Sequence, residues 1–175
     1  GMVHQEFMLI PGFTVTENIK LNREIARPWA VSRLLGRELE ILDYACMNKD
    51  ARAALDSVGM DQLSEGTPVG GLPVGYMQFI EIAREIDKKG MKLLVFDEPT
   101  AVLKQLVLET LSRLNRETGL TIVMVSSELQ ELRSICQRIA IVSEGKIHCI
   151  LRPDSSAVSF GLAMSGAEVE GSELV

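Results

Sequence analysis

The hydrophobic positions of the chain form two short continuous runs, each of which ends in polar residues. The first run covers residues 93–96 and the second covers residues 120–125. Continuous apolar runs of this length are typical of strands that are buried on both faces of a parallel sheet. A helical pattern over residues 106–115, which Gly119 ends, separates the two runs. This order predicts that the strands, residues 92–96 and 120–125, are parallel neighbours joined by a right-handed crossover.

Helical patterns dominate the sequence before the first run. Thr14 and Glu17 have the spacing of a capping box, which predicts a short helix that ends at about Glu24. Apolar residues recur at intervals of three and four over residues 37–58. We therefore expect an amphipathic helical stretch there, with a break near residues 48–50.

Two β-rich runs lie near the C-terminus. They cover residues 138–143 and 146–151 and flank a Glu-Gly pair at residues 144–145, which predicts a β-hairpin. A last short helix is expected over residues 156–165, and the acidic residues 167–175 are expected to form a flexible tail. The whole pattern predicts an α/β fold with a parallel core sheet, a helical subdomain and a C-terminal β-hairpin.

Composition and charge narrow the classes of function. A chain of 175 residues that is 46% hydrophobic is long enough for one domain with a core. A net charge of −6 argues against a general affinity for nucleic acid. The spacing of Cys46, Cys136 and Cys149 fits neither a zinc site nor a disulfide framework, so a reducing cytosol is expected. No apolar run approaches the roughly 18 residues of a transmembrane helix, so a membrane link is expected to run through a partner.

The first apolar run ends in adjacent carboxylates, Asp97 and Glu98, which Pro99 follows. Carboxylates are costly to bury unless they are paired or bind a metal, so these acids are expected at the carboxyl edge of the sheet. In P-loop NTPases the acid at this position holds Mg²⁺, and a following Glu can orient or deprotonate the attacking water. The alternative is a simple turn after a core strand.

The sequence Leu-Leu-Val-Phe-Asp-Glu-Pro-Thr at residues 93–100 resembles the Walker B segment of ABC transporter ATPase subunits. The resemblance implies a Mg²⁺-associated role for Asp97 and a catalytic role for Glu98. His-Gln-Glu-Phe at residues 4–7 resembles the Q-loop of the same family, and residues 8–18 are similar to importer subunits for sugars and nucleosides. Gln5 is then implied to sense metal and water and to pass the nucleotide state to membrane subunits. Without the resemblance it would be an exposed residue in a turn.

The family's signature, Leu-Ser-x-Gly-Gln, corresponds to Leu72, Pro73, Val74, Gly75 and Tyr76. In the family this segment begins a helix and binds the γ-phosphate of ATP held by the opposite subunit. Pro73 replaces the Ser and supplies neither a hydroxyl nor an N–H donor, and Tyr76 replaces the Gln. The alternative is a helix started by proline with a structural role alone. The following helix is expected over residues 77–86, with one apolar face.

Two further segments depart from the family pattern. Ser127 stands where many members place a switch His that contacts the γ-phosphate. The alternative is that Ser127 is the N-cap of a helix over residues 128–135. The D-loop, at residues 101–103, is shorter than in the family, either by true shortening or because a piece of the sequence is omitted.

Together, these matches identify the chain as an incomplete P-loop NTPase (ABC ATPase) domain. Residues 1–90 are expected to form the Q-loop and helical subdomain, and residues 91–166 the rest of the core with Walker B. The family implies ATP and Mg²⁺ as cofactors, and transmembrane permease subunits and a second ATPase subunit as partners. It also implies a cytoplasmic place at the inner face of the membrane.

No Gly-x-x-x-x-Gly-Lys-Ser/Thr occurs in the 175 residues, so the chain by itself is expected not to bind ATP in the family's way. Two functions remain open: the later portion of an importer ATPase, or a catalytically inactive interaction module derived from one.

Overall fold

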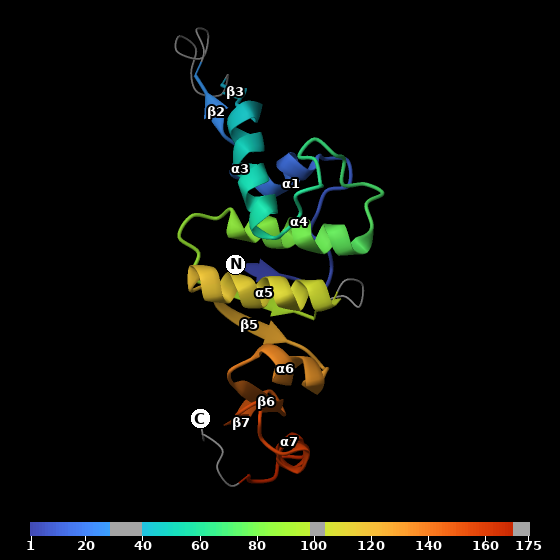
Figure 1. Ribbon diagram of the computed structural model, residues 1–175, viewed down its shortest axis with the longest axis vertical. Coiled ribbons are helices and arrows are strands. Elements are labelled where there is room, and N and C mark those ends of the chain that lie inside the picture. The colour runs from blue at the N-terminus through green and yellow to red at the C-terminus, as the bar shows by residue number, and fades with distance from the viewer. Residues whose placement is uncertain (29–39, 99–103, 170–175) are drawn as a thin grey trace. The chain divides into compact units, whose positions relative to one another are not determined.

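The computed structural model describes residues 1–28, 40–98 and 104–169. The chain divides into two compact units, Gly1–Val125 and Ser126–Val175 (Figure 1). Each unit has a hydrophobic core of its own. The expected boundary after residue 90 falls inside the first unit, because α4 (Val74–Ile86) packs against β1 (Met2–Val3) and both belong to the same core as β4 (Leu93–Asp97). The functional division into residues 1–90 and 91–166 stays a prediction.

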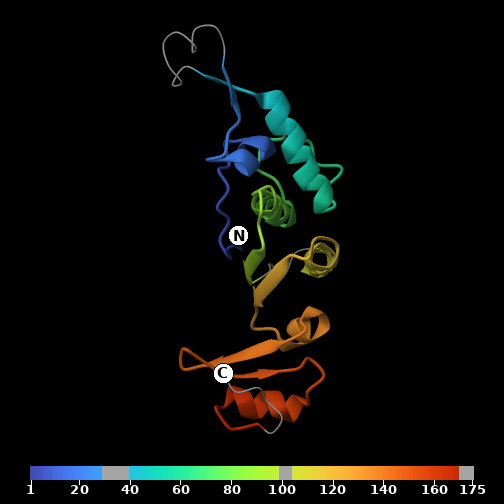
Figure 2. The same ribbon diagram turned by 90° about the vertical axis from the view of Figure 1, so that its left-hand side faces the viewer.

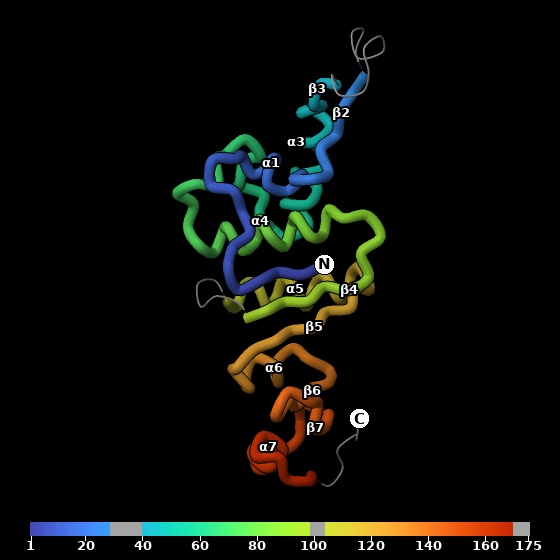
Figure 3. Tube along the Cα trace, turned by 180° about the vertical axis from the view of Figure 1, so that it is seen from behind, coloured from blue at the N-terminus to red at the C-terminus, as the bar shows by residue number. Residues whose placement is uncertain are grey.

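A three-stranded parallel sheet in the order β1-β4-β5 forms the centre of the first unit. Its strands are β1 (Met2–Val3), β4 (Leu93–Asp97) and β5 (Thr121–Val125). Figure 3 shows β1 beside β4 and β4 beside β5. The connection from β4 to β5 is the helix α5 (Lys104–Thr118), which Gly119 ends with a φ of 69°. The predicted parallel neighbours are therefore confirmed.

Only one face of this sheet is covered within the first unit. Leu94 and Phe96 are fully buried in the same cluster as the apolar residues of α5. On the other face, the exposed fractions are 44% for Leu93, 46% for Val123 and 50% for Val125. The expectation of strands buried on both faces is wrong for this unit, because no described element of the unit covers the second face.

The helix α1 (Val15–Lys20) begins with the predicted capping box. The backbone N–H of Thr14 donates to Glu17 Oε2 at 2.7 Å, and the N–H of Glu17 donates to Thr14 Oγ1 at 3.3 Å. The helix ends at Lys20 and does not reach Glu24. Its end is earlier because Leu21 leaves the helical conformation, with ψ at 128°, and Asn22 is left-handed, with φ at 61°.

The next segment contains a small antiparallel pair, β2 (Ala26–Arg27) with β3 (Ile41–Leu42), which the helical pattern did not predict. The helix α3 (Tyr44–Ser57) follows, with the Asp43 side chain as its N-cap. It runs through residues 48–50 without the expected break, because its buried residues lie on one continuous helical face. Residues 29–39, where the helical pattern was expected to begin, lie outside the described part.

The helix α4 (Val74–Ile86) begins three residues earlier than expected and is buried on most of its surface. Phe79, Ile82 and Ala83 are fully buried, which confirms the predicted apolar face. The same helix also buries three polar side chains, those of Gln78, Glu81 and Glu85. A helix that buries acids as well as apolar residues needs partners for those acids.

A cluster of charged side chains joins α1, α3 and the C-cap of α4. The Nζ atom of Lys20 lies 2.6 Å from Asp50 Oδ2 and 2.9 Å from Asp87 Oδ1. Arg23 Nη1 donates to Asp87 Oδ2 at 2.5 Å. Burial lowers the pKa of the Lys20 ammonium, but the bonds and charges of the two aspartates outweigh burial, so the pKa is raised above its ordinary value.

The second unit contains α6 (Leu129–Ile135), the predicted hairpin of β6 (Ile139–Ser143) and β7 (Lys146–Leu151), and α7 (Ala157–Met164). Figure 2 shows α7 lying along the hairpin. The core of the unit comes from these elements: Ile139, Ile141, Cys149, Leu151, Phe160 and Ala163. Both turn residues of the hairpin have positive φ, as a tight two-residue hairpin turn requires.

Among the described helices, none combines the length and the apolar composition needed to cross a bilayer.

Candidate functional site

The carboxyl edge of the parallel sheet carries the acidic candidates. Asp97 is the last residue of β4, and Glu98 follows it; both are half-buried. Glu98 has a φ of 45°, which is uncommon for a residue with a side chain. Its N–H donates to the carbonyl of Val125 at 3.0 Å, so the end of β5 fixes this backbone conformation. The backbone that carries the two carboxylates is therefore held at the edge of the sheet.

The register of β1 brings the Q-loop candidate to the same edge. Val3 pairs with Phe96, so the residues after Val3 leave the sheet beside Asp97. Gln5 lies in a bend two residues later, and its side chain is exposed. The structure thus gathers Gln5, Asp97 and Glu98 at one edge of one sheet, as expected when parallel strands end together.

The signature candidate lies at the N-terminus of α4. Pro73 is the N-cap of this helix and gives no side-chain hydrogen bond. The carbonyl of Pro73 accepts from the N–H groups of Tyr76 and Met77, at 2.9 and 3.3 Å. Among the described residues, the N–H groups of Val74 and Gly75 have no hydrogen-bond acceptor, as is usual for the first turn of a helix. Leu72 is half-buried, Val74 and Tyr76 are exposed, and Gly75 is buried.

Ser127 belongs to the second unit and is exposed. The interpretation of Ser127 as an N-cap is wrong, because Glu128 occupies the N-cap position of α6. Its neighbour Ser126 makes the local contacts: Ser126 Oγ accepts from the N–H of Glu128 and donates to Glu131 Oε2, each at 3.0 Å. A role for Ser127 at a γ-phosphate stays a prediction. The shortened D-loop at residues 101–103 lies outside the described part.

The donor chemistry at the sheet edge suits Mg²⁺ in part. Carboxylate and amide oxygens are the ligands that Mg²⁺ prefers, and Asp97 and Gln5 offer one of each. Within the described ranges there is no group of three or more acidic, His or Cys side chains that could hold a metal ion. Asp97 therefore fits the role of one ligand beside phosphate oxygens and does not form a complete protein site.

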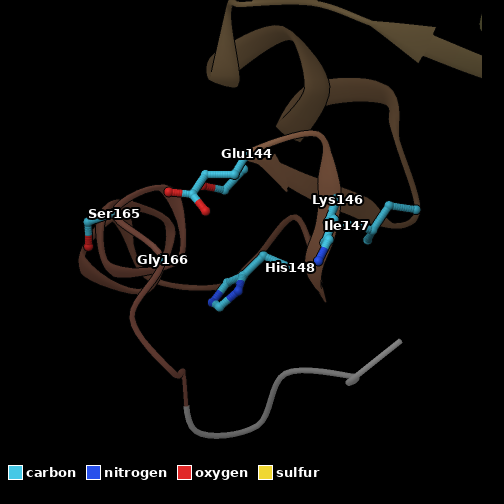
Figure 4. Close-up of a pocket in the computed structure, with 7 residues that line it drawn as sticks. Glu144, Lys146, Ile147, His148, Ser165 and Gly166 are labelled. Carbon is cyan, nitrogen blue, oxygen red and sulfur yellow. The ribbon is translucent and has the colours of Figure 1, made fainter.

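The second unit contains a hollow of about 400 Å³ beside the hairpin turn (Figure 4). Glu144, Lys146 and His148 lie on it, together with Ser165 and Gly166 from the end of α7. His148 Nε2 lies 3.0 Å from the carbonyl oxygen of Ala167, so the ring contacts the backbone that follows α7. The hollow contains none of the candidate residues for nucleotide chemistry.

The chain is similar to known proteins both in fold and in sequence. No family model matches the chain. Solved structures share its fold. One is the dimeric ATP-binding cassette MJ0796 bound to ADP and Pi, with a TM-score of 0.64 and 23% identity over 89% of this chain and 63% of that one. Another is cbiO1 from Clostridium perfringens, with a TM-score of 0.68 and 20% identity over 94% of this chain and 60% of that one.

Curated relatives are more similar in sequence. The ribose import ATP-binding protein RbsA of Chromobacterium violaceum is 35% identical over 83% of this chain, and the xylose import ATP-binding protein XylG of Paraburkholderia xenovorans is 33% identical over 83%. The chain belongs to the ABC ATPase family. A putative ribose/galactose/methyl galactoside import ATP-binding protein of Burkholderia cenocepacia matches this ABC ATPase chain over 97% of its length, at 31% identity.

The ABC ATPase chain spans 27% of the length of RbsA, 26% of XylG and 32% of the Burkholderia cenocepacia protein. The resemblance found in the Walker B and Q-loop segments is thus confirmed at the level of the family and the fold. Sequence reasoning missed two acids of α4 that accept backbone N–H groups on either side of the Q-loop candidate, residues 4–7. Two glutamates four residues apart on an otherwise apolar helix, Glu81 and Glu85, were the available signal.

Proposed function

We propose that this chain is the later portion of the ATP-hydrolysing subunit of an ABC importer for a sugar, with a nucleoside as the other substrate class. The proposal rests on the position of three candidate residues at one edge of the parallel sheet. Asp97 ends β4, Glu98 follows it, and Gln5 lies two residues after the end of β1. The similarity to ribose and xylose import proteins supports a sugar as the transported solute.

Each candidate residue has a chemical task in this proposal. ATP with Mg²⁺ supplies the phosphoanhydride that is cleaved. Asp97 offers a carboxylate oxygen to the metal, and Glu98 accepts hydrogen bonds or a proton from the attacking water. Gln5 offers its amide to metal and water from the neighbouring strand. The N–H groups of Val74 and Gly75 at the start of α4 favour an anion, here the γ-phosphate of ATP held by a second subunit.

The partners follow from the same proposal. A second ATPase subunit supplies the phosphate-binding loop opposite Val74, and permease subunits receive the movement of the helical subdomain. The protein then works at the cytoplasmic face of the membrane, held there through the permease.

The departures at the signature support a second candidate, an inactive interaction module. Pro73 gives α4 no side-chain cap, and the exposed Tyr76 replaces an amide donor. A module of this kind keeps the fold and its docking surfaces and does not bind the γ-phosphate of a partner's ATP.

Association with an intact subunit tests the proposal. The chain is mixed with an ABC ATPase subunit that has its own P-loop and a Gln in place of its catalytic Glu, so that ATP is bound and not hydrolysed. We expect sedimentation velocity to show a mixed dimer that requires ATP and Mg²⁺ and that Pro73→Ser strengthens. No nucleotide-dependent association, even with Pro73→Ser, would favour the inactive module.

A charge at the signature separates anion binding from folding. Val74→Asp places a carboxylate in the first turn of α4, which stabilises a helix through its dipole but repels a phosphate. The matched control is Val158→Asp, which changes an exposed valine in the first turn of α7. The mixed dimer should weaken about tenfold or more with Val74→Asp and stay unchanged with Val158→Asp.

A further inference from the structure

Side chains of α4 bind both ends of the segment that carries Gln5, residues 2–8. The carboxylate of Glu85 accepts the N–H of Met2 at 3.2 Å, at the start of the segment. At its other end, the carboxylate of Glu81 accepts the N–H of Met8. Arg84 Nη1 donates to the carbonyl oxygen of Met8 at 2.8 Å. Both polar groups of Met8 are therefore bound by side chains of one helix.

Burying the Glu81 carboxylate costs free energy that packing alone does not require. Its exposed fraction is 1%, and its second oxygen, Oε2, has no hydrogen-bond partner within the described residues. The nearest cationic atom, Arg84 Nη2, lies 3.7 Å from Oε1, beyond hydrogen-bond distance. An apolar side chain would fill the same space without this desolvation cost. Contact with the Met8 backbone is the feature that an apolar residue would lose.

We propose that Glu81 is a positioning residue for Gln5. Glu81 holds the Met8 peptide on α4, so the helix that begins at the signature candidate sets the position of the Q-loop candidate. The part of this proposal that concerns Gln5 rests on the proposed function, whereas the holding of Met8 does not. Because α4 begins at Val74 and carries Glu81 two turns later, a shift of the helix would move Met8 with it.

The ionisation of Glu81 sets how tightly the segment is held. Burial raises the pKa of Glu81, against the Met8 hydrogen bond and the charges of Arg84 and His4, which lower it; the charge of Glu85 adds to the rise. A raised pKa means that the held state binds a proton more readily than a released, solvated state. The segment is therefore held more tightly as the pH falls through the raised pKa, and less tightly as the pH rises through it.

Amide hydrogen exchange and relaxation measured by NMR on the 175-residue chain test the proposal without nucleotide. Glu81→Leu should lower the protection of the Met8 amide about 10- to 100-fold and lower the order parameter of the Gln5 amide, because the acceptor is lost. Glu81→Gln keeps an oxygen acceptor and the side-chain volume, so protection should be at least that of the parent. The pH dependence of protection should be present in the parent and absent in Glu81→Gln.

The control is Glu117→Leu, which changes an exposed glutamate of α5 and should leave the Met8 and Gln5 signals unchanged. Urea unfolding of each variant separates a local release from a loss of global stability. Unchanged Met8 protection in Glu81→Leu, or an unchanged pH dependence in Glu81→Gln, would overturn the proposal. Failure of the mixed dimer would contradict the proposed function and leave the Met8 result standing, so the two failures are distinguishable.

Discussion

At the scale of single residues, buried charges decide how the helices of the first unit are held together. The exposed fractions of the Lys20 and Asp87 side chains are 6% and 8%, and the two groups are ion-paired to each other. Removing one member of a buried pair leaves the other charged and desolvated, which costs more than the pair itself contributes. Loss of the Lys20 ammonium would therefore destabilise the fold chiefly by leaving the buried Asp87 carboxylate without this partner.

Replacing that ammonium should be strongly destabilising. We expect Lys20→Met, which keeps most of the aliphatic stem, to lower the free energy of unfolding by about 3 kcal/mol in urea denaturation. The control is Asp56→Asn on α3, which breaks a half-exposed pair with Arg52 and should cost at most about 0.5 kcal/mol. Similar small losses for the two variants would show that Asp87 is satisfied by Arg23 alone.

At the scale of elements, sequence patterns located the helices and strands better than they located their ends. The apolar runs predicted β4 and β5, and the spacing of Thr14 and Glu17 predicted the start of α1, because these signals are local. The end of α1 depends on the left-handed Asn22. The pairing of β2 with β3 depends on the meeting of two segments that are distant in sequence.

The capping box allows a quantitative check at this scale. Thr14→Ala removes the hydroxyl that accepts the N–H of Glu17, so the free energy of unfolding should fall by about 1 kcal/mol. Thr14→Ser keeps the hydroxyl and should stay within about 0.5 kcal/mol of the parent. Urea denaturation followed by circular dichroism measures both. Equal losses in the two variants would assign the effect to the threonine methyl group.

The candidate site was predictable where it follows from strand ends and not where it follows from packing. Asp97 and Glu98 follow an apolar run, so their place at the sheet edge could be predicted. The burial of Glu81 and its contact with Met8 could not, because an acid on a helix is usually solvated and only tertiary structure supplies its partner. The exposure of the second face of the sheet could not be predicted either, since apolar runs do not show which elements cover them.

At the scale of the whole molecule, the chain is a fraction of the length of its relatives, so activity has to be considered for this chain by itself. The 175 residues contain the Walker B and signature candidates and no Gly-x-x-x-x-Gly-Lys-Ser/Thr segment. In the proposed function, each bound ATP needs a phosphate-binding loop from one subunit and a signature from the other. A pair of these chains offers only the signature candidate and no phosphate-binding loop of the Gly-x-x-x-x-Gly-Lys-Ser/Thr type.

The isolated chain should therefore show neither Mg-ATPase turnover above background nor dimerisation promoted by ATP, and Pro73→Ser should change neither result. A coupled phosphate-release assay and sedimentation with and without nucleotide measure the two properties. Glu98→Gln is the control for contaminating ATPases, because turnover that survives this substitution does not come from the candidate site. Turnover abolished by Glu98→Gln would contradict the prediction.

The left-handed backbone at Glu98 has a consequence for directed evolution. A residue with a side chain costs about 1 kcal/mol or more in this conformation, whereas glycine adopts it freely. A library selected only for heat resistance would therefore enrich glycine at position 98 and discard the carboxylate. Stabilised variants from such a selection would be well folded and, under the proposed function, unable to activate water, so position 98 has to be held fixed during any selection for robustness.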